Sequence, residues 1–102
     1  MDLNGKKGFL VFDNSVFVLD AKSTTIGRLF VNDCIINDPH TSRQHAKIDY
    51  ENGQYVIYDL SSTSGTFINH RKIERHVLSN GDIIMLGDST IIFMYDENNI
   101  FS

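Results

Sequence analysis

The sequence contains little of several features that define whole classes of protein. It has one cysteine, Cys34, so no disulfide can form within the chain and a reducing cytosol suits it. We interpret Cys34 as a small core or strand residue. Apolar runs reach only about five residues, far short of a membrane span. Residues 1–15 contain no long apolar run before a small-residue cleavage site, so we expect no signal peptide and a cytoplasmic location.

An excess of basic residues is missing as well. Lysine and arginine total 9 against 13 aspartate and glutamate residues, which gives a formal net charge of -4. Nucleic-acid binding depends on neutralising many phosphates with a basic face, so we expect no nucleic-acid partner. A small anion site needs only a few arginines, so the positions of the basic residues matter more than their sum.

Helical periodicity is also hard to find, and short strand patterns recur between turn residues instead. The segment 45–50 alternates Ala46, Ile48 and Tyr50 with polar residues, as a half-buried strand does. Tight turns are expected at Asp13-Asn14, Asn52-Gly53, Asn80-Gly81 and Gly87-Asp88. The strand candidates are residues 9–12, 15–20, 24–29, 45–50, 55–60, 66–69, 71–73, 76–78, 82–86 and 90–95.

These patterns predict an all-β fold. With 102 residues the chain is one domain, and strands rich in Val, Ile, Phe and Tyr indicate a sandwich of two twisted, mainly antiparallel sheets. We expect about 10–11 short strands and little or no helix. The only proline, Pro39, lies in the longest segment without a strand pattern, and a polar tail is expected at residues 96–102.

Binding residues of a sandwich collect in the loops at one end. Two segments, from Gly27 to Ser42 and from Ser61 to Asn69, are dense in hydroxyl groups and glycine, and Arg28 and Arg43 lie in or beside the first. Arginine forks and Ser/Thr hydroxyls suit a phosphate, although such loops are also ordinary turn chemistry.

The order of the motifs is more specific than any one of them. Gly27-Arg28, Asn32-Asp33, "SRQH" at 42–45, "DLSSTSGTFIN" at 59–69 and "GDIIMLG" at 81–87 follow one another at spacings that resemble the forkhead-associated (FHA) domain. The motif core spans residues 27–87, and the flanking strands extend the resemblance to a single domain over residues 1–102. The resemblance implies an FHA/SMAD-like β-sandwich with no catalytic residue, metal or cofactor.

The resemblance also implies a ligand, a phosphothreonine in a partner protein or peptide, bound by loops at one end. By the family's pattern Arg28 pairs with the phosphate or the nearby peptide backbone, Ser42 hydrogen-bonds the phosphate and Arg43 adds a second positive contact. Thr63 lies beside the phosphothreonine. The domain is then a monomeric reader of phosphorylation in Ser/Thr kinase signalling.

Other motif residues are implied to fix the loops without touching the peptide. His45 ties neighbouring loops together through its ring, and a loop-scaffold role is implied for Gly27, Gly65, Thr66 and Asn69.

Ser64 departs from the pattern, since the family most often has asparagine before the Gly-Thr pair. The asparagine clamps the backbone of the bound peptide, and a shorter serine can miss that contact. Losing such a hydrogen bond costs about 1 kcal/mol, or about fivefold in affinity. Ser64 also keeps open the alternative that the domain is a phosphorylation-independent interaction scaffold.

Two further alternatives follow from residue types alone. Ser42 as nucleophile and His45 as base would make an enzyme, but residues three apart on a strand point to opposite faces and no GxSxG motif is present. A metal site would draw on the histidines and Cys34, but their spacings match no zinc pattern. The candidate ligands for such a site are His40, His45, His70, His76 and Cys34.

Overall fold

The computed structural model describes residues 7–96, which form eleven strands and, within that range, no helix. Accordingly, no helix there is long and apolar enough to cross a membrane. Apart from Asp96, the expected polar tail at 96–102 lies outside the described residues.

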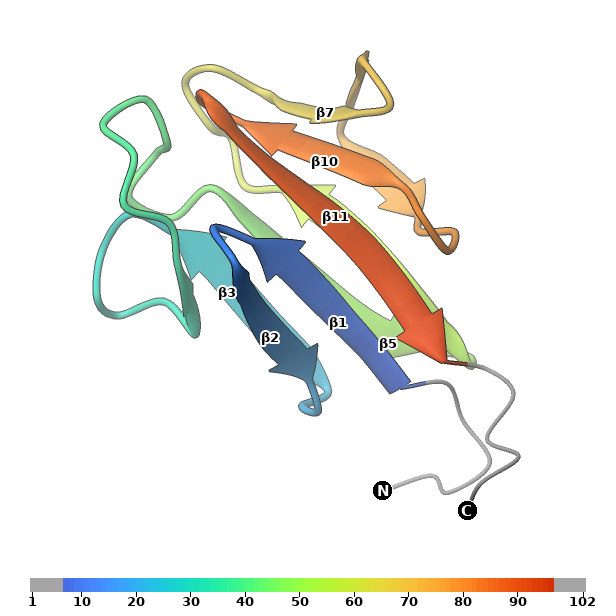
Figure 1. Cartoon of the computed structure of the whole chain (residues 1–102). Helices are drawn as coiled ribbons and strands as arrows, with labels where there is room; N and C mark the ends of the chain where they lie inside the picture. The colour runs from blue at the N-terminus through green and yellow to red at the C-terminus, as the bar shows by residue number, and fades with distance from the viewer. Residues whose placement is uncertain (1–6, 97–102) are drawn as a thin grey trace.

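The strands form two sheets, which Figure 1 shows from the side of the larger one. That sheet has six strands in the order β2-β1-β11-β10-β7-β8, and each neighbouring pair is antiparallel. Its strands are β1 (Lys7–Phe12), β2 (Ser15–Leu19), β7 (Thr66–Ile68), β8 (Arg71–Ile73), β10 (Ile83–Leu86) and β11 (Ser89–Asp96).

The second sheet has five strands in the order β4-β3-β5-β6-β9. Its pairs are antiparallel except β3 with β4, which run parallel. The strands are β3 (Ser23–Gly27), β4 (Cys34–Ile35), β5 (Ala46–Glu51), β6 (Gln54–Asp59) and β9 (Arg75–Val77).

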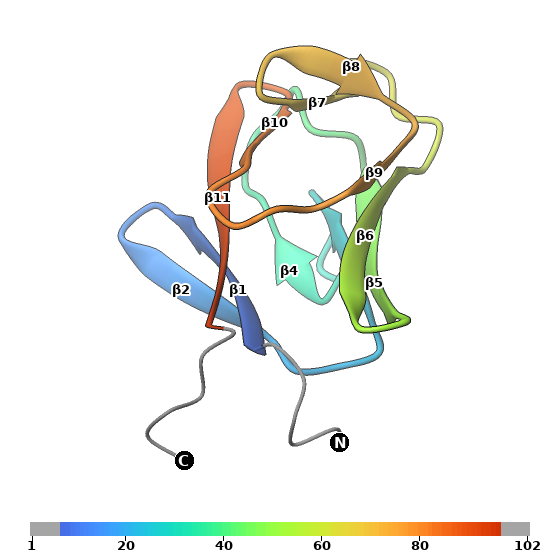
Figure 2. The same ribbon diagram turned by 90° about the vertical axis from the view of Figure 1, so that its right-hand side faces the viewer.

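The two sheets lie on opposite sides of one core (Figure 2). Inward-facing side chains from both sheets, among them Leu10, Ile48, Ile57 and Phe93, are at most 1% exposed. The Tyr55 hydroxyl accepts a hydrogen bond from the N–H of Gly8 at 2.9 Å, which joins β6 to β1 across the sandwich. The predicted two-sheet, mainly antiparallel sandwich is confirmed.

Turn chemistry explains most of the hairpins. Asp13 and Asn14, between β1 and β2, both have positive φ, as two-residue turns of type I′ require. Asn52 and Gly53 do the same between β5 and β6. The structure differs from the expectation at β3, which ends at Gly27, and in the short β4 within the segment that showed no strand pattern. Arg28 is thereby the first residue after β3.

Two loops meet at one end of the sandwich and position the candidate site. They connect β4 to β5 (residues 36–45) and β6 to β7 (residues 60–65), and the first lies at the upper left of Figure 1. The N–H groups of Arg28 and Leu29 donate to the carbonyls of Ser42 (3.1 Å) and Arg43 (3.2 Å), which holds the end of β3 against the first loop.

Candidate functional site

An open pocket of about 640 Å³ lies between these two loops. All five residues expected to contact a phosphopeptide line it, and their contacts with a ligand stay a prediction. The lining residues are Arg28, Pro39, His40, Thr41, Ser42, Arg43, Gln44, Ser61, Thr63 and Ser64. The loop between β4 and β5 contributes six of these ten residues, 39–44, and Arg28 directly follows β3. The formal charges in the lining come from Arg28 and Arg43.

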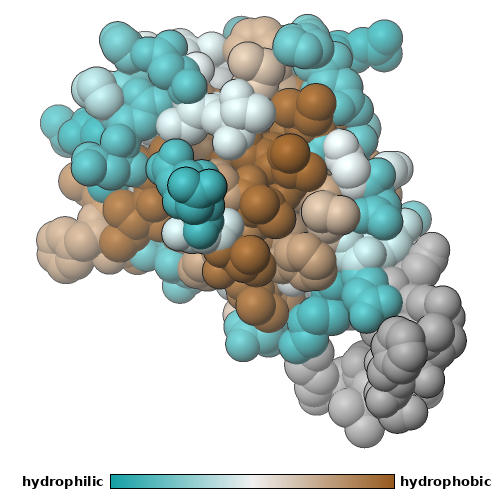
Figure 3. Space-filling view, in the orientation of Figure 1, coloured by the Kyte–Doolittle hydropathy of each residue, from teal (hydrophilic) through white to brown (hydrophobic). Residues whose placement is uncertain are grey.

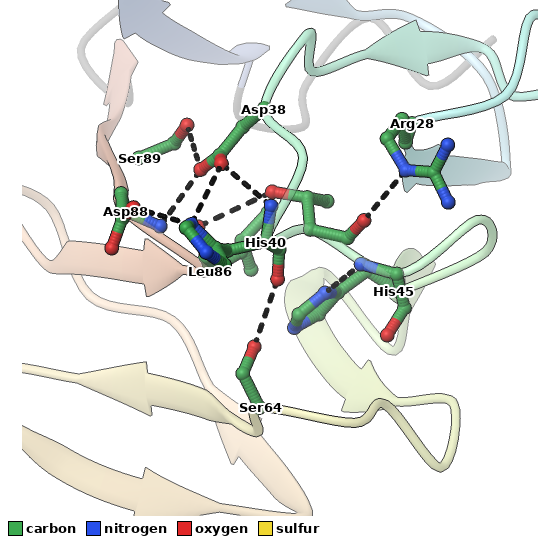
Figure 4. A network of polar contacts seen from close by, with 10 residues as sticks. Arg28, Asp38, His40, His45, Ser64, Leu86, Asp88 and Ser89 are labelled. Carbon is green, nitrogen blue, oxygen red and sulfur yellow. Dashed lines mark hydrogen bonds and ion pairs between the residues drawn. The ribbon is translucent and has the colours of Figure 1, made fainter.

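Arg28 is held by one nitrogen and leaves the rest of its guanidinium exposed. Its Nε donates to the carbonyl of Thr41 at 3.1 Å, and the terminal nitrogens point away from that contact (Figure 4). No partner for the terminal nitrogens occurs among residues 7–96. A guanidinium fixed through Nε keeps a planar pair of donors, which matches two oxygens of a phosphate.

Ser42 joins the two loops through its side chain. Its Oγ accepts a hydrogen bond from the N–H of Thr63 at 2.9 Å, so the hydroxyl hydrogen remains available to an anion. The side chain of Arg43 is exposed, while its carbonyl accepts from the buried Asn32 amide at 2.7 Å. The backbone under both side chains is therefore fixed.

Ser64 is already engaged within the domain. Its exposed Oγ donates to the carbonyl of His40 at 3.2 Å, a contact that links the two loops across the pocket (Figure 4). The single hydroxyl hydrogen of Ser64 is thus used, and only its acceptor capacity is left for a ligand.

His45 is completely buried, and backbone groups use both of its ring nitrogens. Nδ1 accepts from the N–H of Ser42 at 3.0 Å, and Nε2 lies 2.9 Å from the carbonyl of Gly65. Because Nδ1 is an acceptor here, Nε2 carries the proton that is donated to Gly65, and the ring is neutral. The Ser42 hydroxyl points instead to Thr63, so the two residues do not form a nucleophile–base pair.

Glycines 27 and 65 are required by geometry. A Cβ on Gly27 would clash with the backbone of Arg43 and lie 2.8 Å from Asn32 Nδ2. Gly65 has φ +89°, in the region that other residues rarely adopt, and its N–H donates to Ser62 Oγ at 3.0 Å. The end of β3 and the turn into β7 therefore each depend on a glycine.

A half-buried carboxylate, that of Asp59, organises the loop that leads into β7. Asp59 accepts hydrogen bonds from the N–H of Ser62 (3.1 Å), from the Ser62 hydroxyl (2.5 Å) and from the hydroxyl of the fully buried Thr66 (2.7 Å). Desolvation raises the pKa of Asp59, but these hydrogen bonds outweigh it and the net pKa is lowered.

Asn69 does not lie in the pocket lining. It forms the turn between β7 and β8, where its Oδ1 accepts from the N–H of Ile83 at 2.9 Å and its Nδ2 donates to Asp82 at 2.9 Å. Asp82 is buried, and desolvation raises its pKa, but hydrogen bonds from donors including the N–H of Ser79 together outweigh desolvation and the net pKa is lowered. Asn69 thus holds a turn against β10.

Sequence reasoning missed Asp38, which is buried and ties the first loop to the hairpin between β10 and β11. Its oxygens accept from the N–H of His40 (2.9 Å), the N–H of Asp88 (2.7 Å) and the Ser89 hydroxyl (2.9 Å), as Figure 4 shows. The His40 bond contributes most to a lowered pKa of Asp38. The available signal was "DPH", since an aspartate before proline favours a turn closed by its side chain.

The histidines considered as metal ligands have separate surroundings. His40 Nδ1 contacts Asp88 Oδ2 at 2.6 Å on the surface, His45 is buried, and His76 Nε2 contacts Asp82 at 3.0 Å. Within residues 7–96 the group with metal-binding geometry is Asp38, His40 and Asp88, and the backbone donors described above already occupy Asp38. Burial, and secondarily Asp33, raise the pKa of the Cys34 thiol to about 12, which fits a core residue.

Comparison with known proteins gives one family. The model of the FHA domain matches residues 24–87. The chain is 34% identical over 80 residues to the glycogen accumulation regulator GarA of Mycolicibacterium smegmatis, covering 78% of this chain and 51% of that protein. It is 36% identical over 80 residues to the oxoglutarate dehydrogenase inhibitor of Corynebacterium jeikeium, covering 78% and 56%. The chain spans about half the length of the curated relatives it matches.

Solved structures agree with that result. A chain from a structural and functional analysis of phosphothreonine-dependent FHA domain interactions matches with a TM-score of 0.83 and 31% identity, covering 86% of this chain and 95% of that one. Mycobacterium tuberculosis EmbR in complex with a low-affinity phosphopeptide matches with a TM-score of 0.83 and 33% identity, covering 86% and 24%.

Proposed function

The chain belongs to the FHA domain family, and from that premise we propose that it binds threonine-phosphorylated peptides through the pocket beside Arg28. The observation that carries the proposal is that the residues expected to contact a phosphopeptide come together in space. Arg28, Ser42, Arg43, Thr63 and Ser64 come from three segments of the chain, and all five line one open pocket. The assignment of these residues to phosphopeptide contacts, and of residues 1–102 to a single domain, is part of the proposal.

The groups available in the pocket fit a phosphate in charge and in hydrogen-bonding capacity. A phosphothreonine carries about −1.5 to −2 charges near neutral pH, which two arginines balance. The terminal nitrogens of Arg28 and the hydroxyl hydrogen of Ser42 are donors without partners among residues 7–96. Donors fixed in advance by Thr41 and Thr63 lose little conformational entropy when a ligand binds.

The cellular role we propose is that of a non-catalytic reader, which joins a threonine-phosphorylated protein to its target in Ser/Thr kinase signalling in the cytoplasm. GarA and the oxoglutarate dehydrogenase inhibitor are by name a regulator and an inhibitor, and EmbR has been solved with a phosphopeptide. Both ring nitrogens of His45 are hydrogen-bonded to backbone groups. This supports a structural role for His45 and leaves the ring without the free nitrogen that a catalytic base would need.

A phosphorylation-independent scaffold is the second candidate, and the engagement of Ser64 favours it. The hydroxyl of Ser64 donates to His40, so the clamp on the peptide backbone that an asparagine would supply is reduced. If the clamp matters more than the phosphate contacts, the partner is recognised by another surface.

One titration separates the two candidates. An oriented library of phosphothreonine peptides supplies the preferred sequence, and isothermal titration calorimetry then compares that peptide with and without its phosphate. We expect loss of the phosphate to reduce affinity at least about thirtyfold, because a desolvated charged contact is worth at least about 2 kcal/mol. Equal affinity for the two peptides would contradict the proposal and support the scaffold.

A further inference from the structure

The outward surface of the six-stranded sheet carries apolar side chains across five strands. We call this surface the apolar face, and Figure 3 shows its hydrophobic residues as a continuous brown area over β1, β11 and β10. Antiparallel sheets in sandwiches usually have one apolar and one polar side. Its residues are Phe9, Val11, Val16, Val18, Phe67, Ile83, Met85, Ile92 and Met94.

Strand register places these residues on one side. Residues directly opposite each other in an antiparallel pair share a face. Phe9 lies opposite both Val18 and Met94, which connects β1 with its two neighbours, and Ile92 lies opposite Ile83. The intervening residues of each strand, such as Leu10 and Phe93, are completely buried in the core.

Several of these side chains are far from buried. Val16 is 62% exposed, Val18 44%, and Ile92 and Met94 39% each. Isolated apolar residues on a surface are normal, but a contiguous patch marks an interaction site. The four most exposed residues of the apolar face lie on the edge strand β2 and on the central strand β11.

The outer surface of the five-stranded sheet is built differently and shows what a solvated face of this protein looks like. We call it the polar face. There Asp49 accepts from the Ser23 hydroxyl at 2.6 Å and pairs with Lys47 at 3.2 Å, and Glu51 accepts from the Tyr58 hydroxyl at 2.9 Å. Corresponding positions of the six-stranded sheet carry valine, isoleucine and methionine.

In place of the monomer that the sequence resemblance implies, we propose that the apolar face is the interface of a symmetric dimer, and that its occupant is the same face of a second copy of this chain. The centre of the face carries no charge within the described residues, so a charged partner segment finds no counterpart there. A second copy brings an equally apolar, equally shaped sheet, and packing of two sheet faces is a standard arrangement of β-proteins.

The apolar face is large enough for the centre of such an interface, but not for the whole of it. Five strands at about 4.8 Å spacing and about four residues at about 3.3 Å give an apolar area of roughly 24 Å by 13 Å, or about 300 Å². A standard interface covers about 800 Å² on each partner, with an apolar centre inside a polar rim, so the residues around the face must supply the larger share. Lys7, Lys72, Thr90 and Asp96 border the apolar face and supply a rim with charges of both signs.

The dimer leaves the candidate pocket open. None of the residues that line the pocket belongs to the apolar face, because the pocket lies in loops at the end of the sandwich. Two copies joined through their sheets therefore present two pockets. A doubly phosphorylated partner would then gain affinity through the high effective concentration of the second site.

Sedimentation velocity on the 102-residue chain tests the dimer from low micromolar to several hundred micromolar concentration. The informative variants are Ile92→Lys on β11 and Val18→Lys on β2, each of which places a charge on the apolar face. The matched control is Gln54→Lys, which adds the same charge at an exposed position on β6 of the other sheet. Circular dichroism and phosphopeptide titration show for each variant that the fold and the pocket are retained.

We expect the wild-type chain to form dimers in this range. Each apolar-face variant should raise the dissociation constant of the dimer at least about tenfold, and the control should leave it unchanged. A wild-type chain that stays monomeric throughout would overturn the proposal, and another segment or a partner protein would then cover the face. Dimers that survive both lysine substitutions would overturn it as well. Failure of phosphopeptide binding affects the proposed function alone, because the dimer is measured without peptide.

Discussion

The pocket and the apolar face leave opposite kinds of groups without partners. In the pocket, exposed guanidinium and hydroxyl groups stand on a backbone fixed by hydrogen bonds. On the apolar face, valine, isoleucine and methionine side chains stand on a regular six-stranded ladder. The difference indicates two modes of recognition in one small domain, one dominated by charge and the other by burial of apolar surface.

The two regions also differ in what maintains them. The loops of the pocket depend on a few polar residues at their base, chiefly His45, Asp38 and Asp59, each of which forms at least two hydrogen bonds. The apolar face depends only on strand pairing and on the core beneath it. A substitution in one region should therefore change the function of that region and leave the other region unchanged.

The largest difference between the two regions is expected when Arg28 is replaced with alanine. Arg28→Ala removes the fixed guanidinium, so we expect phosphopeptide affinity to fall at least about thirtyfold, to the limit of detection, while the fold and self-association remain. Fluorescence anisotropy with a labelled phosphopeptide measures the loss. The control is Arg75→Ala, which removes the same charge from the polar face. Wild-type affinity in Arg28→Ala would show that the pocket is misassigned.

Replacing His45 tests whether the pocket depends on its buried scaffold. His45→Phe keeps a buried ring but leaves the N–H of Ser42 and the carbonyl of Gly65 without partners, so we expect a loss of about 2–4 kcal/mol in the free energy of unfolding. Urea denaturation measures this loss, and titration of the folded variant should show weaker phosphopeptide binding. Unchanged stability would mean that the two loops do not rely on the ring.

Acid should weaken the pocket loops and the turn between β7 and β8, whereas the centre of the apolar face contains no titratable group. The pKa values of Asp38, Asp59 and Asp82 are lowered in the folded state, so their stabilising effect is complete above the unfolded value of about 4. It is lost as pH falls through the lower folded-state values. We therefore expect these carboxylates to cause little change in melting temperature between about pH 7 and about pH 5, and a decline below about pH 4.

The variant Asp59→Asn tests how much of this decline in melting temperature is due to Asp59. It should melt at a lower temperature than wild type near neutral pH, and the difference should shrink in acid, because the wild-type carboxylate is then protonated too. Asp13→Asn, in the exposed turn between β1 and β2, is the control, since asparagine tolerates its positive φ. A difference between Asp59→Asn and wild type that stays constant with pH would exclude the carboxylate charge as the cause.

The smallest expected effect concerns Ser64. Ser64→Asn restores the longer amide, with both a donor and an acceptor, so we expect phosphopeptide affinity to rise about fivefold, or about 1 kcal/mol. Because Ser64 also bridges to the carbonyl of His40, calorimetry should be paired with a melting curve. Equal or weaker binding in a variant of unchanged stability would show that an asparagine at position 64 does not strengthen the contact with the peptide backbone in this domain.

Most of the fold could be predicted from local pattern. Turn pairs such as Asp13-Asn14 and Asn52-Gly53 have the positive φ values that hairpins need, and the alternation in β5 gave its buried side correctly. In β1 and β11 nearly every position is apolar, so a period of two does not distinguish the inner from the outer side. That ambiguity hid the apolar face, which only the register between strands identifies.

The pocket could be predicted only through the order of its motifs. That order brought together Arg28, Ser42 and Thr63, which the structure places in one lining. It did not reveal Asp38, whose partners Asp88 and Ser89 lie about fifty residues further along the chain and come close only through tertiary packing. The hydrogen bond from Ser64 to His40 likewise depends on the approach of two loops.

Lys7 and Asp96, the first and last described residues, face each other across the antiparallel pair of β1 and β11. A mechanical force that pulled these two points apart would therefore load the ladder one residue pair at a time, from Lys7–Asp96 toward Val11–Ile92. Such unzipping needs much less force than shearing all the hydrogen bonds together. In an atomic force experiment with handles on these two positions, β1 and β11 should separate first, at low force, and the pocket loops at the other end of β1 should carry load only afterwards.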